Sequence, residues 1–180
     1  GSRKVLMIAA DERYLLTDTG KLFSTGNHPV ETLVPMYHLH KAGFDMDVAT
    51  LSGNPVKFEM WAMPTAQREI TGLHEAYLPR FLKPNRLADI ADALDRDSEY
   101  LAVFIPGGHG ALIGLPQSET VSKVLHWAMD NDRYVISLCH GPAALVAAGM
   151  SGMSGTSGQN SPFQGYSICA FPDAVDRQTP

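Results

Sequence analysis

One cysteine in this sequence stands where a chain can expose a reactive thiol. Cys139 follows the apolar run 134–138 and precedes Gly141-Pro142, where Pro142 is placed to open a helix. A side chain on such a tight turn between strand and helix is forced outward at the sheet edge, and the helix N-terminus stabilises a thiolate. Backbone N–H groups of the same turn point at any oxyanion formed on an attacked carbonyl. The pattern favours a nucleophile, although free cysteine is also a common buried residue.

Two nearby features supply partners for this thiol. His140 follows directly in the sequence and carries an imidazole that can act as a base. The loop 106–110 contains Gly107 and Gly108, whose backbone amides can also face an oxyanion, and His109, which we expect to line the pocket. Three other histidines are expected to cap helices or lie on the surface: His28, His38 and His126.

These loops need a framework that brings them together. Short apolar runs with β-branched residues predict strands, and apolar residues at helical spacing predict helices. The expected strands are 4–9, 45–50, 101–105 and 134–138, and the expected helices are 30–41, 86–95 and 120–131. Because strands alternate with helices, we expect an α/β flavodoxin-like three-layer sandwich with a parallel sheet. Ligands bind such sheets at the carboxyl ends of the strands, where the chemical loops follow.

The length of 180 residues predicts a single α/β domain over residues 3–180. Two segments interrupt the regular alternation of strands and helices. Residues 54–85 are expected to form a small cap or lid, and the Gly/Ser-rich residues 149–162 a flexible loop.

Composition excludes several classes of protein. Lysine plus arginine total 14 against 19 acidic residues, and a formal charge of −5 disfavours bulk attraction to nucleic acid. No apolar run approaches the roughly 20 residues of a membrane-spanning helix. Two cysteines are too few for a disulfide framework. We therefore expect a soluble cytoplasmic protein with no membrane partner.

Several motifs in order resemble one family. They are residues 137–144, 106–110 and 26–32, together with 9–15 and 165–174. The chain resembles the PfpI-like branch of the class I glutamine amidotransferase-like superfamily. It is most similar there to the bacterial heat-shock chaperone group, also described as glyoxalase III and as protein and nucleic-acid deglycase. The resemblance runs from about residue 4 to residue 180.

This resemblance implies a catalytic triad. Cys139 is the expected nucleophile, His140 its imidazole partner and Asp176 the carboxylate that orients the histidine. A nearby aspartate, Asp173, is a competitor for that last role.

The resemblance also implies an acid and an oxyanion hole. Glu31 matches the glutamate that reaches the nucleophilic sulfur, where a carboxyl group can move protons. A negative charge in the first turn of a helix is an alternative reason for Glu31. The backbone amides of Gly108 and His140 are expected to form the oxyanion hole.

A metal site of two histidines and one carboxylate is implied as well, but this chain departs from it. His40 matches one ligand, and Asp45 stands where a glutamate is expected. Tyr77 occupies the remaining position, with His74 one helical turn earlier as a substitute. Tyrosine is a poor zinc ligand, so we expect no required cofactor and treat zinc at His40 and Asp45 as doubtful.

The implied activity is glutathione-independent conversion of methylglyoxal and glyoxal, and deglycation of their protein and nucleotide adducts. A stress chaperone that holds unfolded clients is compatible with it, alone or beside the chemistry, and a cysteine peptidase is a further alternative. We expect a homodimer. Family members continue beyond the position of Pro180, so C-terminal sheet elements of the family are expected to be absent from this chain.

Overall fold

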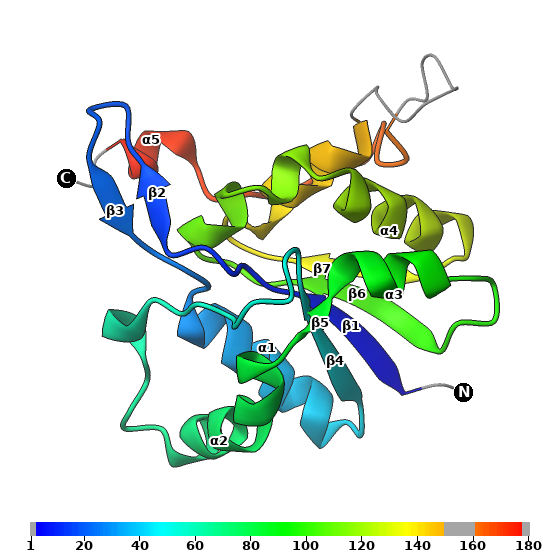
Figure 1. Cartoon of the computed structure of the whole chain (residues 1–180), viewed down its shortest axis with the longest axis horizontal. Helices are drawn as coiled ribbons and strands as arrows, with labels where there is room; N and C mark the ends of the chain where they lie inside the picture. Colours follow the sequence, from blue (N-terminus) through cyan, green and yellow to red (C-terminus); the bar gives the residue numbers. More distant parts are fainter. Residues whose placement is uncertain (1–2, 150–160, 178–180) are drawn as a thin grey trace.

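A parallel sheet forms the centre of the computed structural model, which describes residues 3–149 and 161–177 (Figure 1). Within these residues its strands are β1 (Lys4–Ile8), β4 (Asp45–Thr50), β5 (Asn85–Arg86), β6 (Tyr100–Ile105) and β7 (Tyr134–Ser137). Their order is β5-β4-β1-β6-β7, and all pairs are parallel. From β1 the chain first adds β4 and β5 at one edge of the sheet and then β6 and β7 at the other edge, which is the flavodoxin-like arrangement. The predicted fold class is confirmed.

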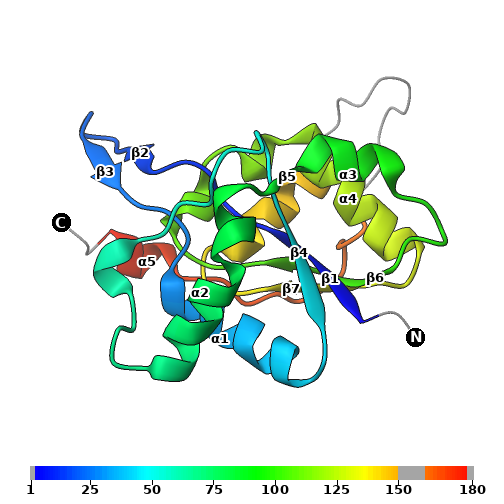
Figure 2. The ribbon, with the colours of Figure 1, turned by 60° about the horizontal axis from the view of Figure 1, so that its bottom comes forward.

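The core lies on both faces of the sheet. Along β1, Leu6 and Ile8 belong to one buried cluster and Val5 and Met7 to the other, because successive side chains of a strand point to opposite faces. The first cluster includes residues of α3 (Leu87–Ala93), α4 (Glu119–Asp130) and the 3-10 helix η4 (Gly141–Gly149). The second includes residues of α1 (Pro29–Lys41) and α2 (Arg68–Leu82). Figures 1 and 2 show these three layers.

The ends of the predicted helices are set by local capping. Helix α1 ends where the N–H groups of Ala42 and Gly43 bond to helix carbonyls, and Gly43 adopts a φ of +86°. Helix α4 begins after Ser118, whose hydroxyl accepts a hydrogen bond from the N–H of Val121. The predicted helices 30–41, 86–95 and 120–131 therefore match α1, α3 and α4 closely.

Residues 11–27, between β1 and α1, contain an antiparallel hairpin. Its strands are β2 (Tyr14–Leu16) and β3 (Leu22–Ser24), with Tyr14 opposite Ser24. The turn includes Gly20 at a φ of +77°. Neither strand buries a side chain, so the sequence offers no alternating pattern to reveal it.

The segment 54–85, expected to be a cap or lid, holds the 3-10 helix η1 (Met60–Ala62) and helix α2. Helix α2 packs beside α1 and buries four of its residues: Ile70, Leu73, Tyr77 and Phe81. Two further 3-10 helices follow β6, η2 (His109–Leu112) and η3 (Leu115–Gln117). That the segment opens or closes over the site stays a prediction.

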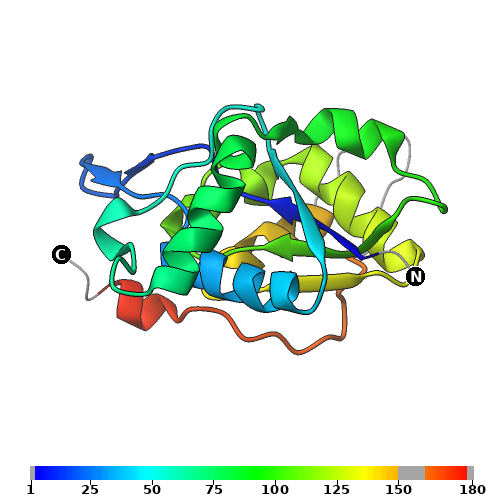
Figure 3. The same ribbon diagram turned by 90° about the horizontal axis from the view of Figure 1, so that it is seen from below.

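One expectation concerns the C-terminal part. The predicted flexible loop 149–162 lies, at residues 150–160, outside the described residues. The segment around Cys169 forms no strand, and Cys169 is exposed. Figure 3 shows this segment running beside β7 to the short helix α5 (Asp173–Asp176). Among the helices of the described ranges, none is both long and apolar enough to cross a membrane.

Candidate active site

Cys139 occupies a strained elbow between β7 and η4. Its φ is +55°, which is uncommon for a residue with a side chain. The turn is closed by a 2.8 Å hydrogen bond from the N–H of Gly141 to the carbonyl of Leu138. A Cβ atom at Gly141 would lie 2.6 Å from the carbonyl oxygen of Ile105, so glycine is required for this approach. The structure therefore shows the expected elbow, although the helix that follows is a 3-10 helix.

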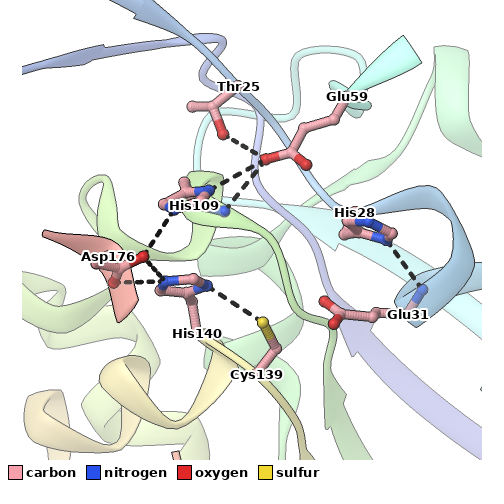
Figure 4. Close-up of polar contacts among 8 residues, drawn as sticks. All are labelled: Thr25, His28, Glu31, Glu59, His109, Cys139, His140 and Asp176. Carbon is pink, nitrogen blue, oxygen red and sulfur yellow. Dashed lines mark hydrogen bonds and ion pairs between the residues drawn. The ribbon is translucent and has the colours of Figure 1, made fainter. Parts of the chain in front are cut away.

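The structure brings the three predicted triad residues into contact (Figure 4). The Sγ atom of Cys139 lies 3.2 Å from Nδ1 of His140. On the other side of the ring, Nε2 of His140 lies 2.8 Å and 3.0 Å from the two carboxylate oxygens of Asp176. The competitor Asp173 instead pairs with Arg177 on the surface, at 2.8 Å.

Glu31 reaches this group from the first turn of α1, and its carboxylate points toward Cys139 in Figure 4. His28 caps the helix, with its Nδ1 atom accepting a 3.5 Å hydrogen bond from the N–H of Glu31. The Oε2 atom of Glu31 is buried and has no hydrogen-bond partner among the described residues. A Cβ atom at Gly107 would collide with Oε2 and lie 2.8 Å from Cβ of Cys139. Glycine at position 107 thus makes room for the carboxylate beside the thiol.

The surroundings of Cys139 correct one expectation from the sequence. Burial, followed by the negative charge of Glu31, raises the pKa of the thiol to about 11. The backbone N–H groups of Gly108 and His140 lower the thiol pKa, but they do not outweigh burial and the charge and hydrogen bonding of Glu31. The expected lowering of the thiol pKa by a helix N-terminus is therefore wrong. The same two N–H groups are those expected to form the oxyanion hole.

A second group of polar residues extends the triad, and sequence reasoning missed its buried member. Glu59 is 3% exposed and accepts a 2.7 Å hydrogen bond from the hydroxyl of Thr25. Its Oε1 atom lies 3.6 Å from Nδ1 of His109, whose Nε2 atom lies 3.1 Å from Asp176. Figure 4 shows this chain of contacts leading to His140. Glu59 stands in no motif, so only the fold reveals it.

Charge in this group is shared between acids and imidazoles. Hydrogen bonding to Glu59 raises the pKa of His109, against the effect of burial. Burial alone would raise the pKa of Asp176, but hydrogen bonds from His140 and His109 outweigh it and leave that pKa lowered. The carboxylate of Asp176 is therefore held in its charged form by two rings.

The residues of the implied zinc site do not fit a metal. Oδ1 of Asp45 lies 2.6 Å from the guanidinium of Arg80 and accepts a 3.2 Å hydrogen bond from the Tyr77 hydroxyl. The hydrogen bond from Arg80 lowers the pKa of Asp45. His40 meets the edge of the Tyr77 ring, and His74 stacks on an aromatic ring of the core. A cationic side chain thus lies where an ion would have to bind.

A flavodoxin-like sheet with a strained cysteine and a histidine directly after β7, and an aspartate of α5 against that histidine, defines an α/β protein with a cysteine at a strand-to-helix elbow. The model of the DJ-1/PfpI family matches residues 22–161. The chain belongs to the DJ-1/PfpI family.

Similar proteins support the resemblance. The chain is 59% identical over 180 residues to the protein/nucleic acid deglycase HchA of Escherichia coli O1:K1 / APEC, covering 100% of this chain and 61% of that protein. The protein of the same name from Shigella flexneri is 58% identical with the same coverage. The chain thus spans 61% of the length of these curated relatives.

Solved structures agree on the architecture. Glyoxalase III from Candida albicans has a TM-score of 0.57 and 25% identity, over 81% of this chain and 61% of that one. Rapid Encystment Protein 24 kDa from Francisella tularensis has a TM-score of 0.64 over 79% of this chain and 61% of that one. At 20% identity the latter shows the fold alone.

Proposed function

We propose that this chain carries the active site of a glutathione-independent glyoxalase and deglycase that uses Cys139 as its nucleophile. The observation that carries the proposal is the meeting of three groups at the strand ends. They are the thiol of Cys139, the ring of His140 at 3.2 Å and the unpartnered Oε2 atom of Glu31. Attack on a carbonyl followed by movement of a carbon-bound proton needs such a nucleophile, base and carboxylate. The names of the similar proteins support the same chemistry.

The first step forms a carbon–sulfur bond. Because the thiol of Cys139 is protonated at neutral pH, its proton passes to Nδ1 of His140 as the sulfur adds to the aldehyde carbon of methylglyoxal. The negative charge that develops on the carbonyl oxygen is stabilised by the N–H groups of Gly108 and His140. Asp176 orients the ring and stabilises its cationic form. The protonated ring of His140 then returns the proton to this carbonyl oxygen, and the product is a hemithioacetal.

The second step moves a proton between neighbouring carbons. The carboxylate of Glu31 removes the proton from the carbon that carries sulfur and returns it to the adjacent carbon. The hydroxyl proton of the hemithioacetal moves to the neighbouring oxygen in the same step, which leaves a thioester on Cys139. Water then cleaves the thioester to give lactate, or glycolate from glyoxal, so the overall reaction adds one water. In deglycation the sulfur displaces the amine from the carbon of an early aminocarbinol. The carbon–nitrogen bond breaks, the amine leaves with the thiol proton delivered by His140, and the same hemithioacetal forms.

Turnover of methylglyoxal in the absence of glutathione tests this proposal. We expect lactate formation by the chain, its loss in Cys139→Ala, and its retention in Cys169→Ala, because Cys169 is exposed and lies outside the site. Circular dichroism of each variant checks the fold. Turnover that persists in Cys139→Ala would contradict the proposal. Cleavage of peptides that depends on Cys139, without any dicarbonyl turnover, would favour the peptidase alternative.

A second function is favoured by the hairpin. Tyr14, Leu16 and Leu22 are 57–67% exposed on β2 and β3, and exposed apolar side chains can hold unfolded clients. For a holdase we expect Cys139→Ala to suppress the aggregation of an unfolded client protein. A Leu16→Ser/Leu22→Ser double variant should suppress this aggregation less. Equal suppression by both variants would contradict a role of the hairpin. The expected homodimer stays a prediction.

A further inference from the structure

The carboxylate of Asp176 is shared by two imidazole rings, and only one of them belongs to the triad. Nε2 of His109 lies 3.1 Å from this carboxylate and Nε2 of His140 lies 2.8 Å from it. The two ring centroids are 4.2 Å apart. His109, His140 and Asp176 each offer one ligand atom, and these three atoms all lie within 4.8 Å of one another. Two imidazole nitrogens and a carboxylate oxygen around one point form a donor set that Zn²⁺ and related divalent ions bind.

The other nitrogen of each ring is already engaged. Nδ1 of His109 lies 3.6 Å from the buried carboxylate of Glu59, which is fixed by the hydroxyl of Thr25. Nδ1 of His140 lies 3.2 Å from the sulfur of Cys139. A histidine that binds a metal commonly donates its second N–H to a carboxylate, which fixes the tautomer. The carboxylate of Glu59 lies just beyond hydrogen-bond distance of Nδ1 of His109, so a small approach gives this arrangement, while Nε2 faces Asp176.

The cluster is also accessible and close to the size that an ion needs. The side chains of His109 and Asp176 are 25% and 29% exposed, so an ion can enter from solvent and keep a water as its fourth ligand. Ligand atoms at about 2.0 Å from a tetrahedral ion are roughly 3.3 Å apart. The separations of 2.8–3.1 Å between the carboxylate and the two Nε2 atoms are within a few tenths of an ångström of this value, and the three ligand atoms all lie within 4.8 Å of one another. Asp176 lies on a four-residue helix, where such a shift is small.

We propose that His109, His140 and Asp176 form a regulatory site for a divalent transition-metal ion such as Zn²⁺. The ion takes the place of the protons now shared between the two rings and the carboxylate, and these protons pass to solvent. With Nε2 on a cation, the ring of His140 is less basic and no longer accepts the proton of Cys139, so bound metal inhibits. The inhibition rests on the proposed function, whereas the binding of metal does not.

Direct titration with Zn²⁺ against a competing chromophoric chelator tests the site. The Cys139→Ala variant is used, because a thiol is itself a zinc ligand. We expect one ion per chain, affinity that rises with pH, and at least a tenfold loss of affinity in an added His109→Gln substitution. Glu59→Gln should weaken binding by about tenfold. His38→Gln, an exposed histidine on α1, is the matched control and should leave affinity unchanged.

Three results would overturn the proposal, and the last comes from a second measurement that guards against misfolded variants. Absence of binding to folded Cys139→Ala would contradict the site. Loss of binding in His40→Gln, with retention in His109→Gln, would place the ion at His40 instead. In the unmodified chain, Co²⁺ should give visible ligand-field bands without the intense sulfur-to-metal band of a thiolate ligand. A strong sulfur band would assign the metal to Cys139 and contradict the site.

Together, the metal-binding and turnover measurements distinguish the metal-site proposal from the proposed enzyme function. Binding to Cys139→Ala that depends on His109, in a chain without methylglyoxal turnover, supports the metal site and contradicts the enzyme. Turnover that is insensitive to Zn²⁺, in a chain whose Cys139→Ala variant binds none, supports the enzyme and contradicts the metal site.

Discussion

The thiol of Cys139 should be slow to alkylate at neutral pH, and removal of the neighbouring charge should speed it up. A pKa of about 11 leaves about one thiol in a thousand ionised at pH 8. Since the carboxylate of Glu31 disfavours a second negative charge beside it, Glu31→Gln should lower the thiol pKa and raise alkylation at pH 8 about tenfold. The same substitution should abolish most dicarbonyl turnover, because the amide cannot move a proton. Faster alkylation together with slower catalysis is the expected signature.

Alkylation with iodoacetamide at pH 6–11, followed by mass spectrometry of the separate peptides, measures this. Cys169, exposed in the same chain, serves as the internal reference. The expected profile for Cys139 rises steeply between about pH 8 and pH 11 and moves to lower pH in Glu31→Gln. A midpoint below about pH 8 in the unmodified chain, or the same profile in both proteins, would refute the reasoning.

Three further perturbations test the surroundings of the site. Asp176→Asn should keep the fold and reduce turnover about a hundredfold or more, whereas Asp173→Asn should be mild; equal rates in steady-state assays would contradict the orienting role. Gly107→Ala should cost about a hundredfold in turnover, because the added methyl displaces the glutamate beside the thiol. Gly72→Ala has open space in α2 and should not reduce turnover, so similar losses in both would rule out this cause. Glu59→Gln should lower the free energy of unfolding by about 1–2 kcal/mol. The loss should be largest between pH 4.5 and pH 6.5, where Glu59 is charged and His109 is protonated in the folded chain. The pKa of Glu59 is lowered by folding, so its stabilising effect disappears as the pH falls through that pKa. The pKa of His109 is raised by folding, so its stabilising effect disappears as the pH rises through that pKa. Urea unfolding measured across pH checks this, and a difference that does not vary with pH would contradict it.

Much of the site could be predicted because its residues follow strands. Parallel strands end at one edge of a sheet, so the loops after β6 and β7 had to meet there. The apolar runs located those strands within one or two residues. Glycine at positions 107 and 141 stands in the motifs, but the close contacts that require it are shown only by the structure. The place of Asp176, however, depended on the family resemblance, since no pattern in the residues distinguishes it from Asp173.

The remaining features depend on contacts between distant segments. Glu59 is separated from His109 by 50 residues, and its burial follows from packing that no local pattern encodes. The raised pKa of the thiol has a similar origin, because it requires burial in the assembled fold and a carboxylate delivered by α1. Likewise, Arg80 meets Asp45 only once α2 has packed beside α1. Spacing along the chain reveals candidate groups, but electrostatic balance is a property of the assembled site.

The position of Asp176 near the end of an exposed segment gives the site a local stability of its own. Residues 165–175 are all exposed, and the described contacts that hold the segment to the site include the hydrogen bond from Phe171 N–H to the Cys139 carbonyl and the bonds of Asp176 itself. Detachment of this segment would leave the two sheet clusters packed, so it should require far less free energy than global unfolding. Hydrogen exchange at the Phe171 amide would then report the fraction of molecules that have lost their orienting carboxylate. Catalytic competence should consequently disappear in mild denaturant while the parallel sheet is still intact.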